Sequence, residues 1–389
     1  MLAFMSAAWP LSNMMVVLFW VSLAFIVYTF VGYPTLLWAL GLGRDKSNHR
    51  ANIWPTLSII IVAHNAAEVV GSKLENTLEL DYPRDKVEII VVSDGSTDDT
   101  GKIVRRYAAR GVKLIEVPER RGKGHAEMVA RDSSRGEILV FTDAAVVLER
   151  VSVRKMIENF ADPSVGVVSS RDVVEGQDGD SGEGSYVNGE MGLRHLESRV
   201  GSLVSVSGSF WGARREVCDV WNAAGCGDFF IPLHAVAQGF RVVMDLECRA
   251  RFAVLRSGRA EFRRKVRTIV QGLDVFFSHL TLLNPFRYGL FSWQLASHKL
   301  FRWLLPYAFM ALLVSNIFLW KSIFFRVFLL LQLFGYGCGL LVWALEDRMD
   351  FRLLKLPAFF LMGNAATLVA WVNFWLGEKY VTWEPSRRT

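Results

Sequence analysis

Stretches of almost purely apolar residues lie near both ends of the chain and enclose a central region that is rich in polar residues. Residues 11–41 contain no charged side chain and residues 301–377 contain few, whereas residues 55–270 carry most of the ionisable groups. A helix of about 20 apolar residues crosses the hydrocarbon of a bilayer. The pattern therefore predicts a water-soluble domain held between membrane-spanning helices.

The first apolar stretch, Leu11–Gly41, is long enough for one tilted or kinked crossing. A cleaved signal peptide is disfavoured, because no basic residues precede the stretch and because it is too long for a signal-peptide apolar region. Arg44, Lys46 and Arg50 follow it, and such cations favour the cytosolic side of a membrane. We therefore expect the next domain to lie in the cytosol, at the inner membrane.

Three later stretches, Phe301–Trp320, Ile323–Leu345 and Leu356–Leu376, are each about long enough to cross a membrane. Before them, residues 284–299 mix aromatic and basic side chains, as in a helix that lies in the membrane interface. The count is four crossings, which would place both ends of the chain outside. Basic residues near the C-terminus favour the cytosol instead, so either the tail is translocated or one stretch is re-entrant.

The central region alternates between short apolar runs and amphipathic segments. The runs Leu57–Ala63 and Val87–Ser93 have the composition of buried parallel strands, and Ala67–Leu78 between them has helical spacing. Further strands are predicted at Lys113–Val117, Ile138–Thr142 and Val165–Ser170. Such alternation predicts a doubly wound, Rossmann-like α/β sheet that binds ligands at the carboxyl ends of its strands.

Composition supports a membrane protein with one soluble domain. Of the 389 residues, 52% are hydrophobic and 21% are charged, which excludes a disordered chain or a collagen. The four cysteines are too far apart for a CxxC metal clip and suit a reducing compartment. A net charge of +6 is small for this length, so nucleic acid is not expected as a partner. The predicted parts are an N-terminal membrane helix and linker at 1–50, a cytosolic domain at 51–270, amphipathic interface helices at 271–300, and three membrane helices with a tail at 301–389.

Acidic residues follow two of the predicted strands. Asp94 ends the second strand, within Ser93-Asp94-Gly95-Ser96, and Asp143 ends the strand that contains Phe141 and Thr142. Since the carboxyl ends of neighbouring parallel strands meet at one edge of a sheet, the two acids would converge on one crevice. Asp94 could accept hydrogen bonds from a nucleotide base or lie near a metal, although a strand-end aspartate is often only a turn former.

Arg121-Gly122-Lys123-Gly124 lies between these two acids and precedes a helical stretch. Backbone amides and the Lys123 ammonium could approach a diphosphate together. The segment is not a P-loop, because the required spacing and the Ser or Thr after the lysine are absent. A nucleoside triphosphatase is therefore disfavoured.

In their order and spacing, these motifs resemble those of membrane-bound family 2 glycosyltransferases with a GT-A domain, similar to cellulose, chitin and hyaluronan synthases and their lipid-linked relatives. The resemblance covers nearly the whole chain, including the membrane segments. The segments that carry it are Ala63-His64-Asn65, Val92-Ser93-Asp94-Gly95-Ser96, Gly122-Lys123-Gly124, Phe141-Thr142-Asp143-Ala144, Gly227-Asp228-Phe229 and Arg264-Lys265-Val266-Arg267.

The resemblance implies a nucleotide-sugar donor, most often a UDP-sugar. It places Asp94 near the base and Lys123 near the diphosphate, and it makes Ala63 and Asn65 further substrate-binding residues. A non-catalytic subunit that binds nucleotide sugar or glycan in a polysaccharide synthesis complex is the alternative. The retained acids and cations argue against it.

The resemblance also implies a metal ligand. Asp143 matches the first acid of the family's DxD motif, but Ala145 occupies the place of the second acid. A Mg²⁺ or Mn²⁺ ion, which the resemblance leads us to expect, would therefore have one carboxylate here, together with diphosphate oxygens and water.

Asp228 matches the final acid of the family's TED or DDx segment, which the resemblance makes the catalytic base. An inverting transfer needs the acceptor hydroxyl to lose its proton as it attacks the anomeric carbon, and a buried carboxylate suits that task. Gly227 replaces the usual preceding acid. Without the resemblance, Asp228 could instead cap the helix predicted at 231–238.

Arg264 and Arg267 resemble the family's (Q/R)xxRW motif, whose arginines bind the diphosphate and stabilise the leaving group. Thr268 stands in place of the motif's tryptophan, which weakens the case for a processive polymerase. Trp211 lies in a segment that resembles the floor of the acceptor site, where it would stack on a sugar, although a core tryptophan is equally compatible. A growing glycan and a lipid-linked acceptor at the lipid bilayer both remain open.

Overall fold

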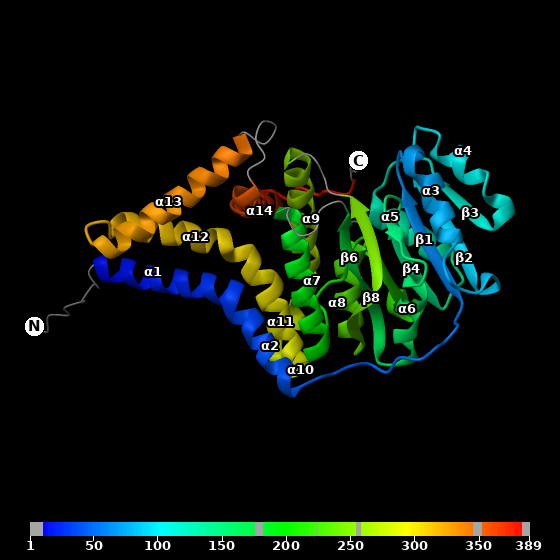
Figure 1. The fold of residues 1–389 in the computed structure, drawn as a ribbon, viewed down its shortest axis with the longest axis horizontal. Coiled ribbons are helices and arrows are strands. Elements are labelled where there is room, and N and C mark those ends of the chain that lie inside the picture. Colours follow the sequence, from blue (N-terminus) through cyan, green and yellow to red (C-terminus); the bar gives the residue numbers. More distant parts are fainter. Residues whose placement is uncertain (1–10, 176–181, 224, 254–257, 345–351, 383–389) are drawn as a thin grey trace, which may run out of the picture.

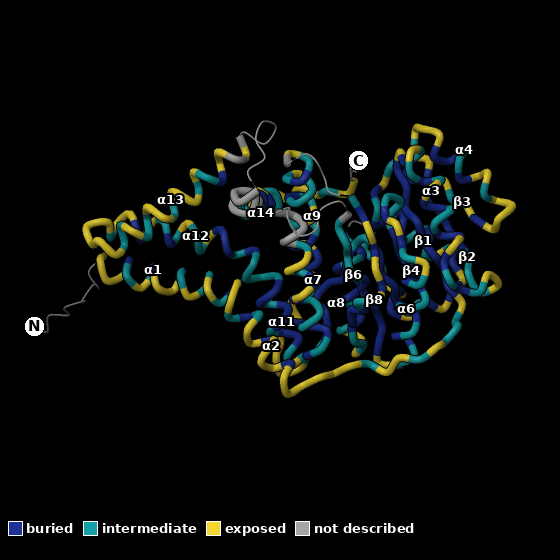
Figure 2. Tube along the Cα trace, viewed as in Figure 1, coloured by how far each residue is buried: buried dark blue, intermediate teal, exposed yellow. Residues whose placement is uncertain are grey.

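The computed structural model describes residues 11–175, 182–223, 225–253, 258–344 and 352–382 of the chain. An α/β domain forms one side of the molecule, and long helices extend from its other side (Figure 1). Three described helices, Leu11–Gly43, Leu290–Phe318 and Ile323–Leu341, are long and apolar enough to cross a membrane. Exposed residues run along these helices, whereas the α/β domain contains most of the buried chain (Figure 2).

The domain is built on one eight-stranded mixed sheet, with the order β3-β2-β1-β4-β7-β6-β8-β5. Its strands are β1 Leu57–Ala63, β2 Val87–Asp94, β3 Val112–Val117, β4 Ile138–Asp143, β5 Val147–Leu148, β6 Val165–Glu175, β7 Phe210–Arg214 and β8 Arg241–Ala253. All five strands predicted from the sequence are confirmed, and the first four pair in parallel. The antiparallel strand β7 between β4 and β6 was not predicted.

Helices cover the two faces of the sheet and connect it to the long apolar helices (Figure 1). Those of the domain are α3 Ala67–Leu78, α4 Thr100–Arg105, α5 Lys123–Ser133, α6 Ser152–Glu158, α7 Gly182–Val200, α8 Gly227–Ala237 and α9 Gly258–Ser278. Helix α3 has the predicted bounds. Helix α9 passes through residue 270, so the predicted end of the domain lies inside a helix.

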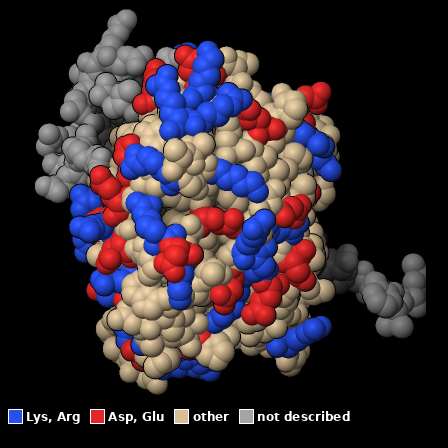
Figure 3. Space-filling model, turned by 90° about the vertical axis from the view of Figure 1, so that its right-hand side faces the viewer, with Lys and Arg blue, Asp and Glu red and all other residues tan. Residues whose placement is uncertain are grey.

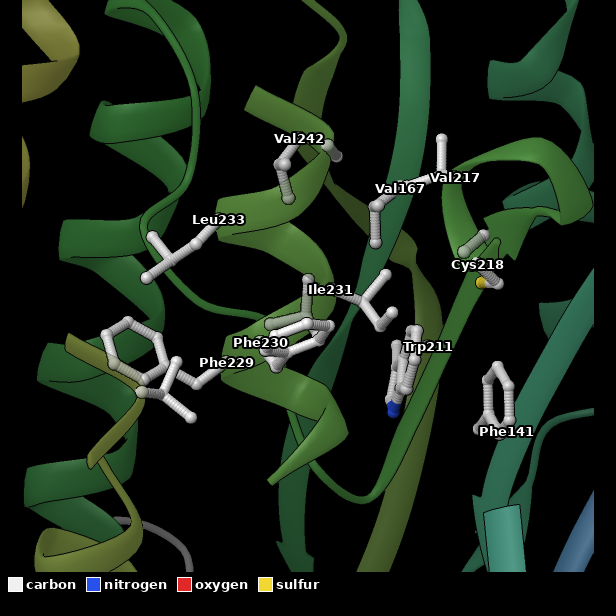
Figure 4. Close-up of a cluster of buried hydrophobic side chains, with 14 of the residues drawn as sticks. Phe141, Val167, Trp211, Val217, Cys218, Phe229, Phe230, Ile231, Leu233 and Val242 are labelled. Atoms are coloured by element: carbon white, nitrogen blue, oxygen red, sulfur yellow. The ribbon is translucent and has the colours of Figure 1, made fainter. Parts of the chain in front are cut away.

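The two faces of the sheet bury separate hydrophobic clusters because successive side chains of a strand point in opposite directions. In β1, Ile60 and Val62 face one cluster, whereas Ile59 and Ile61 face the other. Figure 4 shows part of the first cluster, in which Phe141, Trp211 and residues of α8 lie together. Each fully buried Ile or Val stabilises the fold by about 1.5–3 kcal/mol relative to an exposed one. On the face farthest from α1, acidic and basic side chains are interspersed (Figure 3).

The remaining helices form the other side of the molecule. They are α1 Leu11–Val27, α2 Tyr33–Gly43, α10 Pro285–Tyr288, α11 Leu290–Leu295, α12 Phe301–Phe318, α13 Ile323–Ala344 and α14 Arg352–Trp375. Two π-helical turns, Tyr28–Gly32 and Ala296–Leu300, join α1 to α2 and α11 to α12. Helix α1 packs on α12, and α14 packs on both α13 and α9.

Two predictions about the membrane segments need correction. The helix predicted to begin at Phe301 begins at Leu290, because the chain breaks at Gly289, whose φ is +55°, and not near residue 300. Residues of the predicted interface helix, such as Gln294 and His298, are instead buried inside the protein. Helix α14 contains all but the last residue of the fourth predicted crossing, Leu356–Leu376, which stays a prediction.

Candidate functional site

A cavity of about 1280 Å³ lies where the carboxyl ends of β1 and β4 meet α7, α8, α9 and the membrane-side helices. It collects most of the residues that the sequence singled out. The predicted site residues that line it are Ala63, Asn65, Lys123, Asp143, Asp228, Arg264 and Arg267. They come from segments up to 204 positions apart, so the fold brings the predicted constellation together.

Asp143 and Lys123 form an ion pair on this cavity. The Lys123 ammonium lies 2.6 Å from Oδ1 of Asp143 and donates to the carbonyl of Gly208 at 3.0 Å. Although burial alone would lower the pKa of Lys123, the carboxylates of Asp143, Glu127 and Asp228 raise it above its ordinary value. Lys123 is therefore a permanent cation at the end of β4.

Glu127 is a site residue that the sequence analysis missed. It lies one helical turn after Lys123 on α5, its side chain is 2% exposed, and the Lys123 ammonium is 3.9 Å from it. Burial, together with the nearby Asp228 and Asp143, raises its pKa to about 8, despite the opposing effect of Lys123. Its Oε2 has no hydrogen-bond partner among the described residues. A Cβ at Gly227 would lie 2.8 Å from that oxygen, so Glu127 lies beside the position where the family has its preceding acid.

Asp228 occupies the first turn of α8, after the helix cap at Cys226, so it is not the capping residue. No described residue forms a hydrogen bond with its carboxylate, which lines the cavity. Its backbone carbonyl accepts a hydrogen bond from Val206 at 3.0 Å. A Cβ at Gly208 would lie 2.5 Å from Oδ2, so only glycine leaves room for the carboxylate in this position. The Asp228 carboxylate is therefore able to accept a proton from a molecule in the cavity.

Asp94 does not line the cavity, and its contact with a nucleotide base stays a prediction. Its side chain is fully buried, and its two carboxylate oxygens accept hydrogen bonds from the backbone amides of Arg121 and Gly122, each at 2.8 Å. These amides are therefore committed to Asp94 and not to a diphosphate. Asp94 instead fixes the loop that carries Lys123.

The prediction that Trp211 stacks on a sugar is wrong in this structure. Trp211 is fully buried on β7, where its ring stacks on Phe141 with centroids 4.3 Å apart. Figure 4 shows it surrounded by core side chains. Its alternative role, that of a core tryptophan, is the one observed.

Helix α9 carries the predicted arginines to the edge of the cavity. Arg264 forms two hydrogen bonds with Glu261, of 2.7 and 2.8 Å, and Arg267 lies one turn farther along the same helix. Gln271 on this helix donates to the carbonyl of Tyr380 at 2.6 Å. The segment after α14 is thereby held across the cavity, where Val381 lies against Gly122.

A cluster of charged residues from α7 and the helix Leu290–Phe318 lines the cavity. Glu190 of α7 contacts Arg194 at 3.1 Å, His298 at 2.9 Å and Arg302 at 2.7 Å. Although burial raises the pKa of Glu190, Arg302, His298 and Arg194 hold it well below its ordinary value. Sequence reasoning did not connect these residues, because α7 and the helix Leu290–Phe318 are about 100 positions apart.

Of the two positions of the DxD motif, only Asp143 can supply a carboxylate ligand to a divalent metal. Asp143 offers Oδ2, to which no described residue forms a hydrogen bond, whereas Ala145 offers no oxygen. Within the described ranges, no three His, Cys, Asp or Glu side chains lie close enough to hold a metal ion. Since Mg²⁺ commonly binds through one or two carboxylates plus substrate phosphates, one carboxylate meets the minimum.

Parts of the chain are similar to known proteins. The profile described as Glycosyl transferase family 2 matches residues 58–221. The chain is 33% identical over 108 residues to the probable glycosyltransferase YdaM of Bacillus subtilis, which is 26% of each chain. It is 26% identical over 159 residues to poly-beta-1,6-N-acetyl-D-glucosamine synthase of Staphylococcus epidermidis, which is 40% of this chain and 38% of that protein. The matches thus span well under half of these curated relatives.

The fold is also similar to a solved structure over nearly its whole length. The mannosyltransferase PcManGT from Pyrobaculum calidifontis, solved with GDP-Man and Mn²⁺, superimposes with a TM-score of 0.70 and 24% identity, covering 93% of this chain and all of that one. This likeness confirms the predicted GT-A architecture with membrane-side helices. Residues 58–221 thus match a family 2 glycosyltransferase profile, and the likeness to PcManGT shows the fold over nearly the whole chain.

Proposed function

We propose that the chain is an inverting glycosyltransferase of the inner membrane, which moves a sugar from a nucleotide-sugar donor, a UDP-sugar, to a hydroxyl of a growing glycan or a lipid-linked acceptor. The observation that carries this proposal is the Asp228 carboxylate. It has no hydrogen-bond partner among the described residues, and it shares one cavity with Lys123 and the arginines of α9. An unpaired acid and a set of cations are the two things that the reaction needs.

The proposed reaction is a single displacement. The acceptor oxygen attacks the anomeric carbon of the donor and forms a new bond, while the bond from that carbon to the diphosphate breaks and the diphosphate leaves with the electron pair. Asp228 accepts the hydroxyl proton as the bond forms. Gly208 supports this step because its missing side chain leaves space for the Asp228 carboxylate.

The negative charge that develops on the leaving diphosphate needs stabilisation, which fixed cations in a site shielded from water supply well. Lys123 is held in place by Asp143 and the carbonyl of Gly208. Arg264 is oriented by its two hydrogen bonds with Glu261. Arg267 adds a second guanidinium group on the same helix, and a guanidinium group can donate two parallel hydrogen bonds to phosphate oxygens.

A divalent metal, when bound, would neutralise part of the diphosphate charge, and Asp143 would hold it. Mn²⁺ in the PcManGT complex agrees with this expectation for the fold. Electron paramagnetic resonance of added Mn²⁺ in the presence of UDP tests it: Asp143→Asn should weaken Mn²⁺ binding about tenfold. Equal Mn²⁺ binding by the variant and the wild type would remove Asp143 as the ligand.

The nucleotide and the acceptor class are the finer parts of the proposal. The PcManGT complex contains a guanosine nucleotide, whereas the family resemblance favours uridine. Equilibrium binding of UDP and GDP to the purified chain decides between them. Transfer from radiolabelled nucleotide sugars in the presence of membrane lipid then shows whether the product enters the lipid phase or forms a polymer.

Asp228→Asn tests the proposed base. The substitution keeps the size of the side chain but removes the proton acceptor, so we expect transfer to fall by at least about 10²-fold while nucleotide binding stays within about threefold. Asp219→Asn is a matched control, because Asp219 precedes α8 but pairs with His234 outside the cavity. Retained transfer in Asp228→Asn, or loss of nucleotide binding in the folded variant, would remove Asp228 as the base.

A further inference from the structure

The cavity continues beyond the reacting groups toward the candidate membrane helices. On that side its walls are apolar and come from α1, the turn after it, α12 and α14. They include Ile26, Phe30, Phe309 and Phe360. The rings of Phe30 and Phe309 lie 5.6 and 5.4 Å from the ring of Phe360, so these helices form one continuous aromatic wall. A single cavity therefore joins Asp228 to surfaces that an acyl or prenyl chain can contact.

Three cations, Arg194, Lys299 and Arg302, line the cavity between these two regions. Arg194 and Arg302 pair with Glu190, whose carboxylate also contacts His298, so that this acid is fully engaged. Even so, Nη1 of Arg194 is buried without a hydrogen-bond acceptor among the described residues. The ring of cations thus retains donors that the protein does not satisfy.

Lys299 adds further donors of this kind. Its ammonium has no hydrogen bond or ion pair among the described residues and lies 5.0 Å from the centroid of the Phe229 ring, which follows Asp228. The residue belongs to the π-helical turn Ala296–Leu300, and such widened turns occur frequently at functional sites. A half-buried cation without a contacting ion-pair partner is costly unless a ligand supplies a negative charge beside it.

We infer that the acceptor is a lipid whose head group carries both an anionic phosphate and a free hydroxyl. The phosphate would bind Lys299 with Arg194 and Arg302, the apolar chain would lie along the aromatic wall, and the hydroxyl would reach Asp228. The inference rests on the proposed transferase function and narrows its acceptor. The hydroxyl oxygen forms the bond to the sugar and its proton passes to Asp228, while the lipid phosphate remains unchanged.

Three short probes separate the parts of such a lipid. Dioctanoyl phosphatidylglycerol has chains, phosphate and hydroxyls, dioctanoylglycerol lacks the phosphate, and glycerol 3-phosphate lacks the chains. Native mass spectrometry of the full chain in detergent gives an apparent Kd for each. We expect phosphatidylglycerol to bind wild-type protein at least tenfold more tightly than either of the other probes.

Variants at Lys299 locate the phosphate. Lys299→Met should weaken binding of phosphatidylglycerol about tenfold and leave dioctanoylglycerol within threefold, whereas Lys299→Arg should stay within threefold of wild type for both. Lys113→Met makes the same charge change on an exposed strand outside the cavity and should have no effect.

Two results would overturn the inference, and one of them needs no variant. The first is equal wild-type binding of phosphatidylglycerol and either simpler probe. The second is unchanged binding of phosphatidylglycerol by folded Lys299→Met. Binding of UDP and GDP to the same protein tests the transferase proposal separately. If wild-type protein binds neither nucleotide but binds lipid in a way that depends on Lys299, the transferase proposal is refuted and the lipid site is retained.

Discussion

At the scale of single residues, the site depends on where side chains are absent as much as on where they are present. Gly208 leaves space for the Asp228 carboxylate, and Gly227 leaves space for Glu127. Both carboxyl groups lie near Lys123 and help to raise its pKa. Small changes at these glycines should therefore act on catalysis through the carboxylates.

Gly208→Ala should displace the proposed base. The added methyl would lie 2.5 Å from Oδ2 of Asp228, which is closer than real Cβ contacts allow, so the carboxylate must move. We expect kcat to fall at least about tenfold, since misplacement of a reacting group is costly, while the Kd for nucleotide changes less than threefold. Steady-state kinetics and nucleotide titration measure both. Gly192→Ala, at an exposed position of α7 with open space around it, is the control, and an unchanged kcat in Gly208→Ala would contradict the argument.

Glu127→Gln should make stability less sensitive to pH. The pKa of Glu127 is raised from 4.5 to about 8 in the fold, so the folded chain retains a proton that the unfolded chain releases. This stabilisation is fully present below pH 4.5 and is lost as the pH rises toward 8. Relative to wild type, the variant should gain roughly 2–4 kcal/mol between pH 5 and pH 8. Thermal unfolding at both pH values measures the gain, and Glu79→Gln, at an exposed position, should show none.

At the scale of elements, the segment after α14 forms part of the cavity wall near Lys123. Gln271 of α9 binds the carbonyl of Tyr380, and the backbone of Val381 lies directly against Gly122. Gly122 has a φ of +96°, and its amide donates to Asp94. The loop before α5 is therefore clamped between Asp94 on one side and the C-terminal segment on the other.

Gly122→Ala tests this clamp. The substitution combines a strained left-handed backbone with a clash against the Val381 carbonyl, so we expect it to destabilise the fold by about 2–4 kcal/mol. Gly111→Ala is matched in backbone, with a φ of +85°, but has open space around it, and it should cost only about 1 kcal/mol. Unfolding midpoints in detergent compare the two. Equal losses would show that the C-terminal segment does not press on the loop.

The sequence predicted the elements whose signals are local. Buried parallel strands such as Leu57–Ala63 are short apolar runs, and α3 has clear helical spacing. Strand β8, Arg241–Ala253, was missed, although the alternation of polar and apolar residues along half of it is typical of a half-buried strand. The Lys123 and Glu127 spacing of one helical turn was the only local signal for Glu127. Nothing local pairs Glu190 with His298, because that contact exists only once the domain and the membrane-side helices are packed together.

At the scale of the whole molecule, the long helices predict how the chain is oriented in a membrane. Helices α1, α12 and α13 extend away from the sheet, and the turn between α12 and α13 lies at their far end (Figure 1). If these helices cross the membrane with the domain in the cytosol, that turn lies outside. Trp20, Leu330 and other large apolar side chains on them are half-exposed, as expected for contact with lipid.

Cysteine labelling checks this orientation. Ser322→Cys places a thiol in the far turn and Ser72→Cys places one on α3 of the domain, both at exposed positions. A membrane-impermeant maleimide should label position 322 in intact cells and position 72 only after permeabilisation. The unsubstituted chain, in which Cys218 and Cys248 are buried and Cys226 and Cys338 are half-buried, gives the background. Labelling of position 72 in intact cells would reverse the assignment.

The apolar helices form part of the wall of the cavity that contains the site residues. Ile26, Phe309 and Phe360 enclose the same space as Lys123 and Asp228. A fragment restricted to residues 51–270 would keep the reacting groups but lose one side of their enclosure. The long apolar helices are thus part of the site, and their removal should open the cavity to water.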